Sequence, residues 1–432
     1  MVKKLDNTSK EMYKIGKTIF PINRSITGEG NRKTLKILSK VFSDIIIHEV
    51  KTGTKCFDWE IPKEWNVRDA YIINPDGKKI CSFKKNNLHL LGYSSPINKR
   101  LPLNDLKKHL YSIPEKLNAI PYKTSYYKKN WGFCISENER KRLKKGTYTV
   151  FIDSELKNGS LTYGEILIKG KSKKEIFLST YICHPSMANN EVSGPTVTIF
   201  LAKWLSKLKE RKYSYRIVFI PETIGSITYL SKNLKSLKKN VIAGFNISCV
   251  GDNRSYSYLP SRNGKTLSDD IAKHVLKYKC KDFKSYTWLD RGSDERNYCS
   301  PGIDLPIASI MRTKYGEYPE YHTSDDKFGS VVTEAGLYGA YEIIKLAIKS
   351  IEINCKPKVK VLGEPKLDKR GLRSFTFSNK KWDGFEKLII DFFSLCDGKS
   401  SLIEISETLE KPIWEVEEIL NICIKNNIVK IS

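Results

Sequence analysis

The spacing of hydrophobic and polar residues divides the chain into three stretches of different character, and the first of these, up to about residue 170, has two parts. In residues 9–48, helical periodicity occurs on both sides of a turn, Pro21 to Gly30, that contains two glycines. This pattern predicts two amphipathic helices joined by the turn. Between Cys56 and about Gly170, short alternating segments are separated by clusters of Pro, Gly and Asn, which is typical of a β-rich module. Strands of this module are expected at 70–73, 147–152 and 164–169.

The second stretch alternates short apolar runs with longer periodic segments. We expect strands at 176–181, 215–220, 241–250 and 305–310, and helices at 194–208, 226–237, 267–279 and 332–351. Strands that alternate with helices of this length imply right-handed crossovers. The prediction is an α/β fold with a mainly parallel sheet that helices cover on both faces. Functional residues of such a sheet lie at the carboxyl ends of its strands.

The third stretch follows a linker, residues 356–378, in which prolines and glycines stand among many charges. Three helical segments and a terminal strand then give the outline of a winged helix; they are expected at 384–396, 401–409, 413–425 and 428–431. The predicted domains are therefore an α/β domain, a β-rich insert and a winged-helix domain, at residues 1–50 with 165–355, 51–164 and 379–432.

Composition narrows the class of protein. The chain has 432 residues, of which 40% are hydrophobic, as expected for a folded protein of several domains. No run reaches the ~18 apolar residues of a membrane span, and the N-terminal residues lack the apolar core of a signal peptide. We therefore expect a cytoplasmic protein. Its ten cysteines form no C-x-x-C pair, which favours reduced, mostly buried thiols over a zinc ribbon or a disulfide framework.

The formal net charge of +27 suggests a polyanionic partner such as nucleic acid. The distribution of charge argues against DNA, because residues 379–432 hold seven lysines and ten acidic residues, a net charge of −3. The helix expected to read DNA carries Glu415, Glu417 and Glu418, whereas DNA binding needs a basic face. We expect this domain to contact protein, either a different protein or a second copy of this chain. The excess positive charge is expected to favour an anionic substrate at most.

Two of the six histidines stand where chemistry is expected. His184 and His322 each follow a predicted strand among small and acidic residues, and Glu222 ends the strand expected at 215–220. Strand ends can place imidazole nitrogens and carboxylate oxygens around one metal ion. The residues therefore predict a metal site, in which Glu222 is either a ligand or a general base.

Four phrases resemble a family of aminopeptidase-like proteins: Phe57 to Trp65 (FDWEIPKEW), Cys183 to Ser186 (CHPS), Gly292 to Arg296 (GSDER) and Glu320 to Ser324 (EYHTS). The order of His184, Glu222, Asp252, Asp294 and His322 along the chain is also similar to that of the zinc-dependent aminopeptidase superfamily. This superfamily includes bacterial leucyl aminopeptidases and glutaminyl cyclases. The resemblance covers essentially the whole chain. It implies an aminopeptidase-like fold with a β-rich insert and a C-terminal winged helix, and a link to bacterial surface-polysaccharide biosynthesis.

The same resemblance implies that His184 and His322 bind separate zinc ions, with Glu222 as base or ligand. Three positions depart from the superfamily pattern. The bridging aspartate falls on Asn190, and the usual pair of glutamates is reduced to Glu222 and Thr223. The third-strand aspartate falls near Ser248 or Cys249, with Asp252 as the nearest carboxylate. An amide cannot supply the negative charge that a carboxylate gives two Zn²⁺ ions. We therefore expect one zinc ion rather than two, or none, with Asn190 among the metal ligands.

Substrate contacts are expected beside this centre. The candidates are Asp294, Glu295, Arg296 and Tyr321. The planar guanidinium of Arg296 suits a bidentate contact with a carboxylate, although the acidic and basic residues of this turn would also form local ion pairs at a solvated surface.

Three functions compete on the sequence alone. The first is a metal-dependent hydrolase of a small amide, either a peptide or an N-acylated sugar intermediate. The second is a binding or scaffold protein of the same fold whose ligands have eroded, as Asn190 and Ser248 suggest. The third is a nucleic-acid binder, which only the net charge supports. We favour the first.

Overall fold

The computed structural model describes residues 7–372 and 384–431. The described residues form two compact units, one within residues 1–269 and 282–342 and the other within residues 270–281 and 343–432. The first unit contains the large sheet, the β-rich module and the candidate site, and the second contains the C-terminal helices. The domain division at residues 50, 164 and 355 stays a prediction.

The two N-terminal helices are confirmed. Helix α1 spans Asn7–Ile19 and α2 spans Glu29–Ser39. The glycines of the turn between them are needed for close approach of the backbone. A Cβ on Gly28, which has φ of 108°, would lie 2.3 Å from the carbonyl oxygen of Trp65, and one on Gly30 would lie 2.0 Å from that of Asn23. This turn is therefore pressed tightly against its neighbours.

The large sheet has eight strands in the order β1-β10-β12-β11-β13-β16-β14-β15. The strands are β1 (Ile46–Lys51), β10 (Ser160–Ile168), β12 (Ser214–Ile220), β11 (Glu175–Tyr181), β13 (Val241–Asn246), β16 (Ile307–Met311), β14 (Ser257–Leu259) and β15 (Lys284–Ser285). The four central strands, β12, β11, β13 and β16, are parallel. Strands β1 and β10 are antiparallel at one edge, and β14 is antiparallel to β16 at the other.

The expectation of a mainly parallel sheet is therefore not confirmed, because the sheet is mixed. The physical reason at the first edge is the path of the chain, which leaves the sheet through β1 and returns through β10 after the β-rich module. Two strands that run out to an insertion and back pair antiparallel. Apolar runs mark these segments as strands but carry no signal of their direction.

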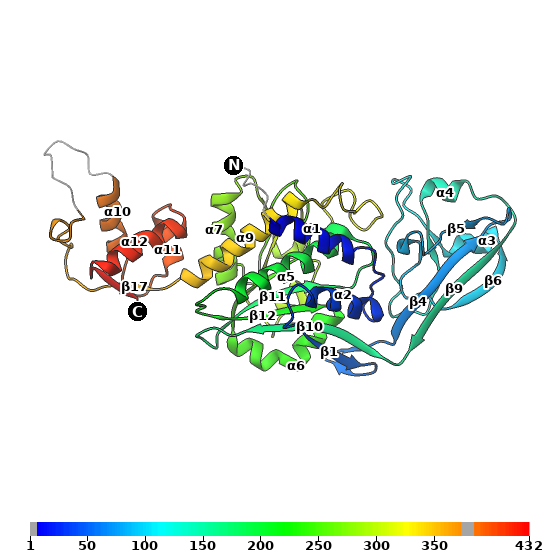
Figure 1. Ribbon diagram of the computed structural model, residues 1–432, viewed down its shortest axis with the longest axis horizontal. Coiled ribbons are helices and arrows are strands. Elements are labelled where there is room, and N and C mark those ends of the chain that lie inside the picture. The colour runs from blue at the N-terminus through cyan, green and yellow to red at the C-terminus, as the bar shows by residue number, and fades with distance from the viewer. Residues whose placement is uncertain (1–6, 373–383, 432) are drawn as a thin grey trace. The chain divides into compact units, whose positions relative to one another are not determined.

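Helices pack on both faces of this sheet (Figure 1). A Cβ on Gly164 of β10 would meet Leu35 of α2, whereas the neighbouring Tyr163 packs edge-on against Tyr229 with ring centroids 5.6 Å apart. Successive strand residues point to opposite faces, so α2 and the helix of Tyr229 lie on opposite sides. The remaining helices of this part of the chain are α5 (Ser193–Ser206), α6 (Ile224–Asn240), α7 (Leu267–Lys279), α8 (Glu295–Tyr298) and α9 (Glu334–Ile353).

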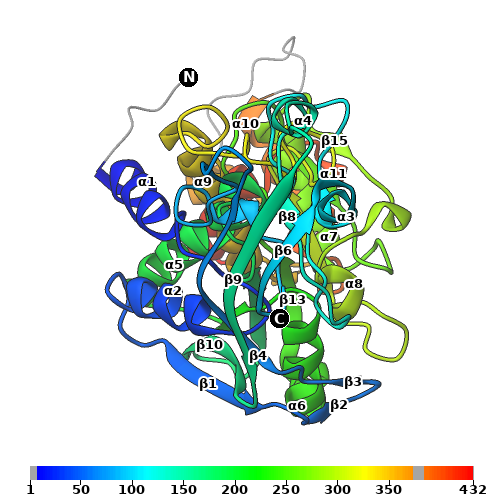
Figure 2. The same cartoon turned by 90° about the vertical axis from the view of Figure 1, so that its right-hand side faces the viewer.

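The β-rich module is confirmed as a second, antiparallel sheet in the order β5-β4-β9-β6, in which β4 and β9 are the long strands (Figure 2). Its strands are β4 (Glu64–Ile73), β5 (Lys79–Ile80), β6 (Ile97–Pro102) and β9 (Thr147–Lys157). Shorter elements surround it: β2 (Lys55–Cys56), β3 (Trp59–Glu60), α3 (Leu103–Leu106), β7 (Leu110–Tyr111), β8 (Phe133–Cys134) and α4 (Glu137–Lys141). The segment expected at 164–169 belongs to β10, which lies in the large sheet.

The C-terminal helices follow the predicted winged-helix outline. They are α10 (Gly384–Ser394), α11 (Leu402–Thr408) and α12 (Ile413–Lys425), and β18 (Val429–Ile431) pairs antiparallel with β17 (Pro357–Val359). Strand β17 lies inside the segment expected to be a linker, so that part of the linker prediction is wrong. Residues 373–378 of the predicted linker lie outside the described residues.

The N-terminus of α12 is occupied by a contact inside the second unit. Nε2 of His274 accepts a hydrogen bond of 2.8 Å from the backbone N–H of Ile413, while its Nδ1 pairs with Glu407. Lys277 contacts the other oxygen of Glu407 at 2.7 Å. The end of the helix that reads base edges in helix-turn-helix proteins is therefore engaged within the protein.

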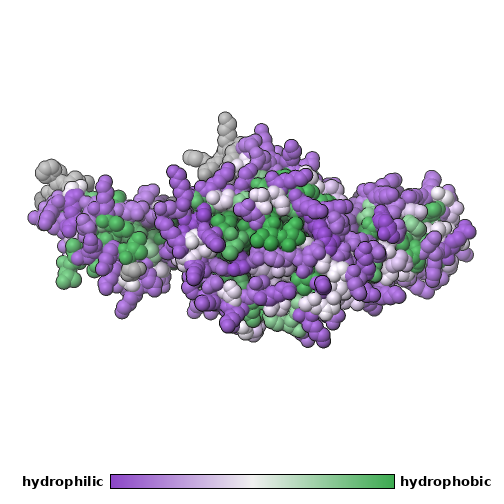
Figure 3. Space-filling model, turned by 60° about the horizontal axis from the view of Figure 1, so that its bottom comes forward, coloured by the Kyte–Doolittle hydropathy of each residue, from purple (hydrophilic) through white to green (hydrophobic). Residues whose placement is uncertain are grey.

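The cysteines, the helix lengths and the surface bear on the predicted class of protein. All ten cysteines are free, and eight of them are buried, which confirms the expectation of mostly buried, reduced thiols. Within residues 7–372 and 384–431, no helix has the length and apolar character that a membrane crossing requires. The face in Figure 3 is mostly hydrophilic and has hydrophobic surface near its centre.

Candidate active site

The segments that follow the four parallel strands meet at one edge of the large sheet. His184 follows β11, Glu222 follows β12, Cys249 follows β13 and His322 lies beyond β16. Four non-glycine residues in these segments have a left-handed backbone: Ser186 (φ 41°), Thr223 (φ 65°), Cys249 (φ 51°) and His322 (φ 53°). Backbone strain of this kind clusters at functional sites. The residues predicted to be functional therefore lie at the carboxyl ends of the parallel strands, in segments with a strained backbone.

His184 is buried and lies between two carboxylates. Its Nδ1 is 3.2 Å from Oε2 of Glu191, and its Nε2 is 3.6 Å from Oε2 of Glu222. The backbone N–H of His184 also donates to Oε2 of Glu191. The imidazole ring is therefore held on one side by Glu191 and presents its other nitrogen to Glu222.

Glu191 is in turn paired with Arg24, a residue that the sequence did not single out. The Nε of Arg24 donates to Oε1 of Glu191 at 2.9 Å, and both side chains are almost completely buried. Arg24 also donates to the carbonyl oxygen of Ile19 at 2.6 Å. The charge of Glu191 is thus compensated by Arg24. A single buried arginine in a turn gives no sequence signal that could have identified this role.

The side chain of Asn190 links His322 to Tyr181, the last residue of β11. Its Oδ1 is 3.0 Å from Nε2 of His322, and its Nδ2 is 3.0 Å from the hydroxyl oxygen of Tyr181. The Tyr181 hydroxyl donates to the backbone oxygen of Asn190 at 2.6 Å. The rings of His184 and His322 have centroids 5.7 Å apart. The three residues predicted as metal ligands therefore lie together.

Glu222 is held by the neighbouring Gly292–Arg296 turn. Ser293 Oγ donates to Oε1 of Glu222 at 2.8 Å, and 21% of the glutamate side chain remains accessible. Asp294, which is fully buried, accepts from the backbone N–H of Thr223 at 2.8 Å and from Ser226 Oγ at 2.7 Å. Asp294 therefore fixes the strained Thr223 and, through it, the position of Glu222.

The other predicted substrate contacts differ in their exposure to solvent. Glu295 is buried, and its two oxygens accept from four donors, which are the backbone N–H groups of Gly292 and Ser293, the Tyr315 hydroxyl and the Asn246 amide. Arg296 is exposed and donates to Thr223 Oγ1 at 2.6 Å. Tyr321 stacks on His322 with ring centroids 3.9 Å apart. Of this group, Arg296 and Tyr321 are accessible beside Glu222 and His322.

A π-helical turn, Ala188–Val192, carries Asn190 and Glu191. Asp326 holds it by accepting from the backbone N–H groups of Asn189 at 2.7 Å and Asn190 at 3.0 Å. Asp252, the carboxylate nearest in sequence to Ser248, accepts from Asn189 Nδ2 and from Thr313. Both aspartates therefore support the backbone around the site.

The β-rich module contributes aromatic residues that the sequence analysis missed. Its residues near Pro121 pair with Thr323, and the backbone N–H of Tyr122 donates to the carbonyl oxygen of His322 at 2.8 Å. The Tyr122 ring has its centroid 5.1 Å from those of both His184 and His322. Its hydroxyl is 2.9 Å from that of Tyr126. Only the tertiary contact between the module and the large sheet reveals this covering.

Burial and neighbouring charges shift the acid–base behaviour of the site. Burial lowers the pKa of His184, but the hydrogen bond with Glu191 and the charges of Glu191 and Glu222 raise it above its ordinary value. Burial, together with the charge of His184, lowers the pKa of His322 to about 3. Burial raises the pKa of Glu222, against the charge of His184. Burial and the charge of Glu222 raise the pKa of Asp294 to about 7.

The chemistry of the donors tests whether zinc fits here. Two ions do not fit, because the position between the two histidines holds the neutral amide of Asn190, whose nitrogen is bonded to Tyr181. In residues 7–372 and 384–431, no group of three or more His, Cys, Asp or Glu has the arrangement of a metal site. The donors for a metal ion here are one imidazole nitrogen of each histidine and Oδ1 of Asn190, which contacts Nε2 of His322 in the present arrangement. These residues lack the carboxylate that would bridge two ions.

Comparisons with known proteins identify sequences similar to this chain. The profile of a domain of unknown function, DUF4910, matches residues 13–354, and that of a winged helix-turn-helix matches residues 355–431. A relative from Clostridium acetobutylicum, named a polysaccharide biosynthesis protein with an aminopeptidase-like domain, is 44% identical over 404 residues. The match covers 92% of this chain and 91% of the relative. The predicted resemblance to aminopeptidase-like proteins linked with polysaccharide biosynthesis is confirmed.

Solved structures show the same fold. A Clostridium acetobutylicum structure described as a peptidase superposes with a TM-score of 0.91 at 41% identity, covering 99% of this chain and 98% of that one. A zinc aminopeptidase from Bacillus subtilis superposes with a TM-score of 0.58 at 13% identity, covering 81% of this chain and 96% of that one. The second likeness establishes an aminopeptidase-like fold and nothing more.

Proposed function

This chain belongs to the DUF4910 family, and from that premise we propose that it hydrolyses an amide bond in a small substrate. The single observation that carries the proposal is the position of Glu222, whose Oε2 lies 3.6 Å from Nε2 of His184 at the open side of the site. A partly buried glutamate beside a buried histidine at the carboxyl ends of the strands is suited to proton transfer.

Glu222 acts in this proposal as the general base. Ser293 fixes one of its oxygens at 2.8 Å, which leaves the other oxygen beside His184. Burial raises the pKa of Glu222, and a raised pKa brings a carboxylate closer to the range in which it can both accept and return a proton. Asp294 is a positioning residue because it holds Thr223, the neighbour of Glu222.

One zinc ion would be held by His184, His322 and Asn190. A zinc ion bound there supplies polarisation of the scissile carbonyl and a lowered pKa of a water molecule. Glu191 orients His184 through Nδ1, as carboxylates commonly do for metal-bound histidines. Arg24 compensates the charge of Glu191 and fixes its position for that task.

The substrate that suits these residues is a small peptide or amide, with an anionic group on Arg296. Arg296 is exposed beside Glu222, and Tyr321 and Tyr122 would form aromatic walls next to His322. Given the name of its Clostridium relative, we place the substrate among the intermediates of surface-polysaccharide biosynthesis, in the cytoplasm. The C-terminal domain serves as a protein-contact module, homo-oligomer formation included, rather than as a DNA reader.

A second candidate function is a binding or scaffold protein without catalysis. It is favoured by Asn190, whose amide is bonded at both ends, to His322 and to Tyr181. A site in which the bridging carboxylate has become a satisfied amide can bind a ligand and no longer turn it over.

Both functions are tested by one set of assays. The wild type is incubated with aminoacyl p-nitroanilides and with N-acetylated amino sugars, with zinc titrated from none to excess. The hydrolase proposal expects turnover that saturates with zinc and that His184→Ala with His322→Ala abolishes. The matched control is His109→Ala, since His109 stacks on Trp131 in the β-rich module and touches neither zinc ligand.

Two outcomes distinguish the candidates. Turnover in the wild type excludes the scaffold function. An inactive wild type that gains zinc affinity on Asn190→Asp, while still releasing no amine, supports the scaffold function and overturns the hydrolase.

A further inference from the structure

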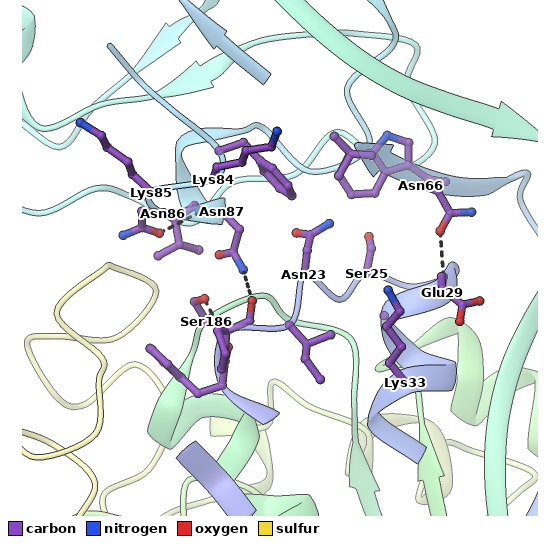
Figure 4. A pocket seen from close by; sticks show the side chains of 18 of the residues that line it. Asn23, Ser25, Glu29, Lys33, Asn66, Lys84, Lys85, Asn86, Asn87 and Ser186 are labelled. Atoms are coloured by element: carbon purple, nitrogen blue, oxygen red, sulfur yellow. Dashed lines mark hydrogen bonds between the residues drawn. The ribbon is translucent and has the colours of Figure 1, made fainter. Parts of the chain in front are cut away.

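A separate cavity of about 630 Å³ lies between the Pro21–Gly30 turn and the β-rich module (Figure 4). Its walls are the turn, the start of α2, residues 65–67 of β4 and residues 83–88. Ser186, Ser324 and Lys327 complete the lining from the large domain. The volume lies within the range of small-molecule sites.

The inner wall of this cavity carries polar groups without partners. Asn87 is only 9% exposed, and its Oδ1 has no hydrogen-bond partner, while its Nδ2 donates to the carbonyl oxygen of Pro21 at 3.3 Å. The side chains of Asn23 and Ser25 also line the cavity, and neither bonds to any residue in the described ranges. A buried acceptor left unpaired is costly, so these groups are suited to the hydroxyls of a ligand.

The outer wall is positively charged. Four lysines line it, Lys33, Lys84, Lys85 and Lys327, against a single acidic residue, Glu29. Lys84 pairs with Asp69 at 3.3 Å, and Glu29 is 3.5 Å from Arg32. Across the part of the chain that the structure describes, the other three lysines have no carboxylate partner.

The first turn of α2 adds to this field. Glu29, Gly30 and Lys33 of that helix border the cavity, and a helix N-terminus carries partial positive charge. Three uncompensated lysines and a helix N-terminus around polar side chains without partners form a site for a negatively charged ligand.

The segments that line the cavity also carry residues of the candidate active site. Asn23 and Ser25 line the cavity, whereas Arg24 between them pairs with Glu191. Ser186 and Ser324 each lie two residues beyond a histidine of the site, His184 and His322. A ligand in the cavity would therefore contact both flanks of Arg24 without occupying the position beside Glu222.

We propose that this cavity binds a small anion that carries hydroxyl groups, that is, a sugar bearing a phosphate or a carboxylate. The lysines recognise the anionic group, and Asn23, Ser25 and Asn87 recognise the hydroxyls. The proposal does not depend on amide hydrolysis, because none of these residues takes part in it.

Isothermal titration calorimetry on the full chain tests the proposal with four probes: glucose 6-phosphate, glucuronate, inorganic phosphate and glucose. Glucose 6-phosphate or glucuronate is expected to bind at least about tenfold more tightly than either glucose or inorganic phosphate, since only they supply both charge and hydroxyls. The tighter of the two identifies the anionic group. Equal affinity for glucose, or no binding of either sugar anion, overturns the proposal.

Variants locate the binding. The double variant Lys33→Gln with Lys327→Gln is expected to weaken sugar-anion binding about tenfold or more, and Asn87→Asp to weaken it similarly by placing a carboxylate against the ligand. The matched controls are Lys36→Gln, one turn further along α2, and Asn98→Asp on the exposed strand β6. Circular dichroism checks that each variant is folded. Binding that the controls weaken as much as the cavity variants would contradict the proposed location.

Discussion

The candidate active site and the neighbouring cavity use charge in opposite ways. In the site, Arg24, Glu191 and His184 are buried, and Glu191 pairs with Arg24 on one side and with His184 on the other. In the cavity, Lys33 and Lys327 are exposed and are not neutralised by any carboxylate in the described parts of the chain. The two regions meet at the same short segment, in which Arg24 points one way and its neighbours the other.

This difference separates two tasks. Buried, paired charges hold side chains in one geometry and shift their pKa values, which proton transfer requires. Exposed, unpaired charges leave their interaction energy for a ligand, which binding requires. The first region is therefore expected to respond to mutation in turnover and stability, and the second in ligand affinity.

The largest expected effect is on turnover. Glu222→Gln keeps the shape of the side chain and the hydrogen bond from Ser293 but removes the basic group. Loss of a general base lowers kcat by about 10²- to 10⁴-fold. The measurement is steady-state hydrolysis of an aminoacyl p-nitroanilide. Glu210→Gln, at an exposed ion pair with Lys171, is the control, and comparable rates for the two variants would remove Glu222 from the mechanism.

The next effect is on stability, at the segment that the two regions share. Arg24→Met removes the arginine that compensates the buried carboxylate of Glu191, which then keeps only its contacts with His184. This is expected to lower the free energy of unfolding by about 3–5 kcal/mol. Arg68→Met breaks an exposed pair with Asp153 at the protein surface, and because water screens that pair it is expected to change the free energy of unfolding far less. Urea denaturation measures both. Equal losses would show that burial does not distinguish these pairs.

A pH dependence of stability follows from Asp294. Its pKa is raised to about 7, so between pH 4 and pH 7 the folded chain holds a proton that the unfolded chain releases. The free energy of unfolding therefore falls as pH rises through this range. Asp294→Asn removes this contribution.

The measurement is urea denaturation of zinc-free protein at pH 4.5 and pH 7.5. The stability of the variant relative to the wild type should increase by about 1–3 kcal/mol between these two pH values. Asp304→Asn, at an exposed pair with Arg262, serves as the control. A relative stability that stays constant or moves in the opposite direction would contradict the raised pKa.

The smallest effect is expected at the aromatic cover. Tyr122→Phe keeps the ring between His184 and His322 and removes only the hydroxyl that contacts Tyr126. Loss of one such hydrogen bond costs about 0.5–1.5 kcal/mol of stability. Thermal unfolding measures that loss, and Tyr127→Phe, whose side chain is 55% exposed, is the control. A loss of several kcal/mol would mean that the hydroxyl, rather than the ring, holds the module in place.

The comparison also explains what the sequence could predict. Helices and central strands followed from periodicity, because α7 and α12, for example, repeat apolar residues at helical spacing over 13 residues each. His184, Glu222 and His322 could be located because each stands just beyond a predicted strand. Their meeting at one sheet edge follows from the topology of parallel strands.

The rest depends on tertiary contacts that leave no local signal. Arg24 is one arginine in a basic chain, and only the fold shows that it is buried against Glu191. Tyr122 reaches the site because the β-rich module folds back onto residues near Thr323. The antiparallel edge of the large sheet is set by the path of the chain through β1 and β10, which apolar runs do not record.

The proposed function includes one zinc ion held by the two histidines and Asn190. The most direct measurement is titration of metal-free protein with zinc by isothermal titration calorimetry, with anomalous scattering at the zinc edge to locate the ion. We predict one zinc per chain between His184 and His322, lost in His184→Ala. Two ions per chain, or no zinc under saturating conditions, would contradict the account.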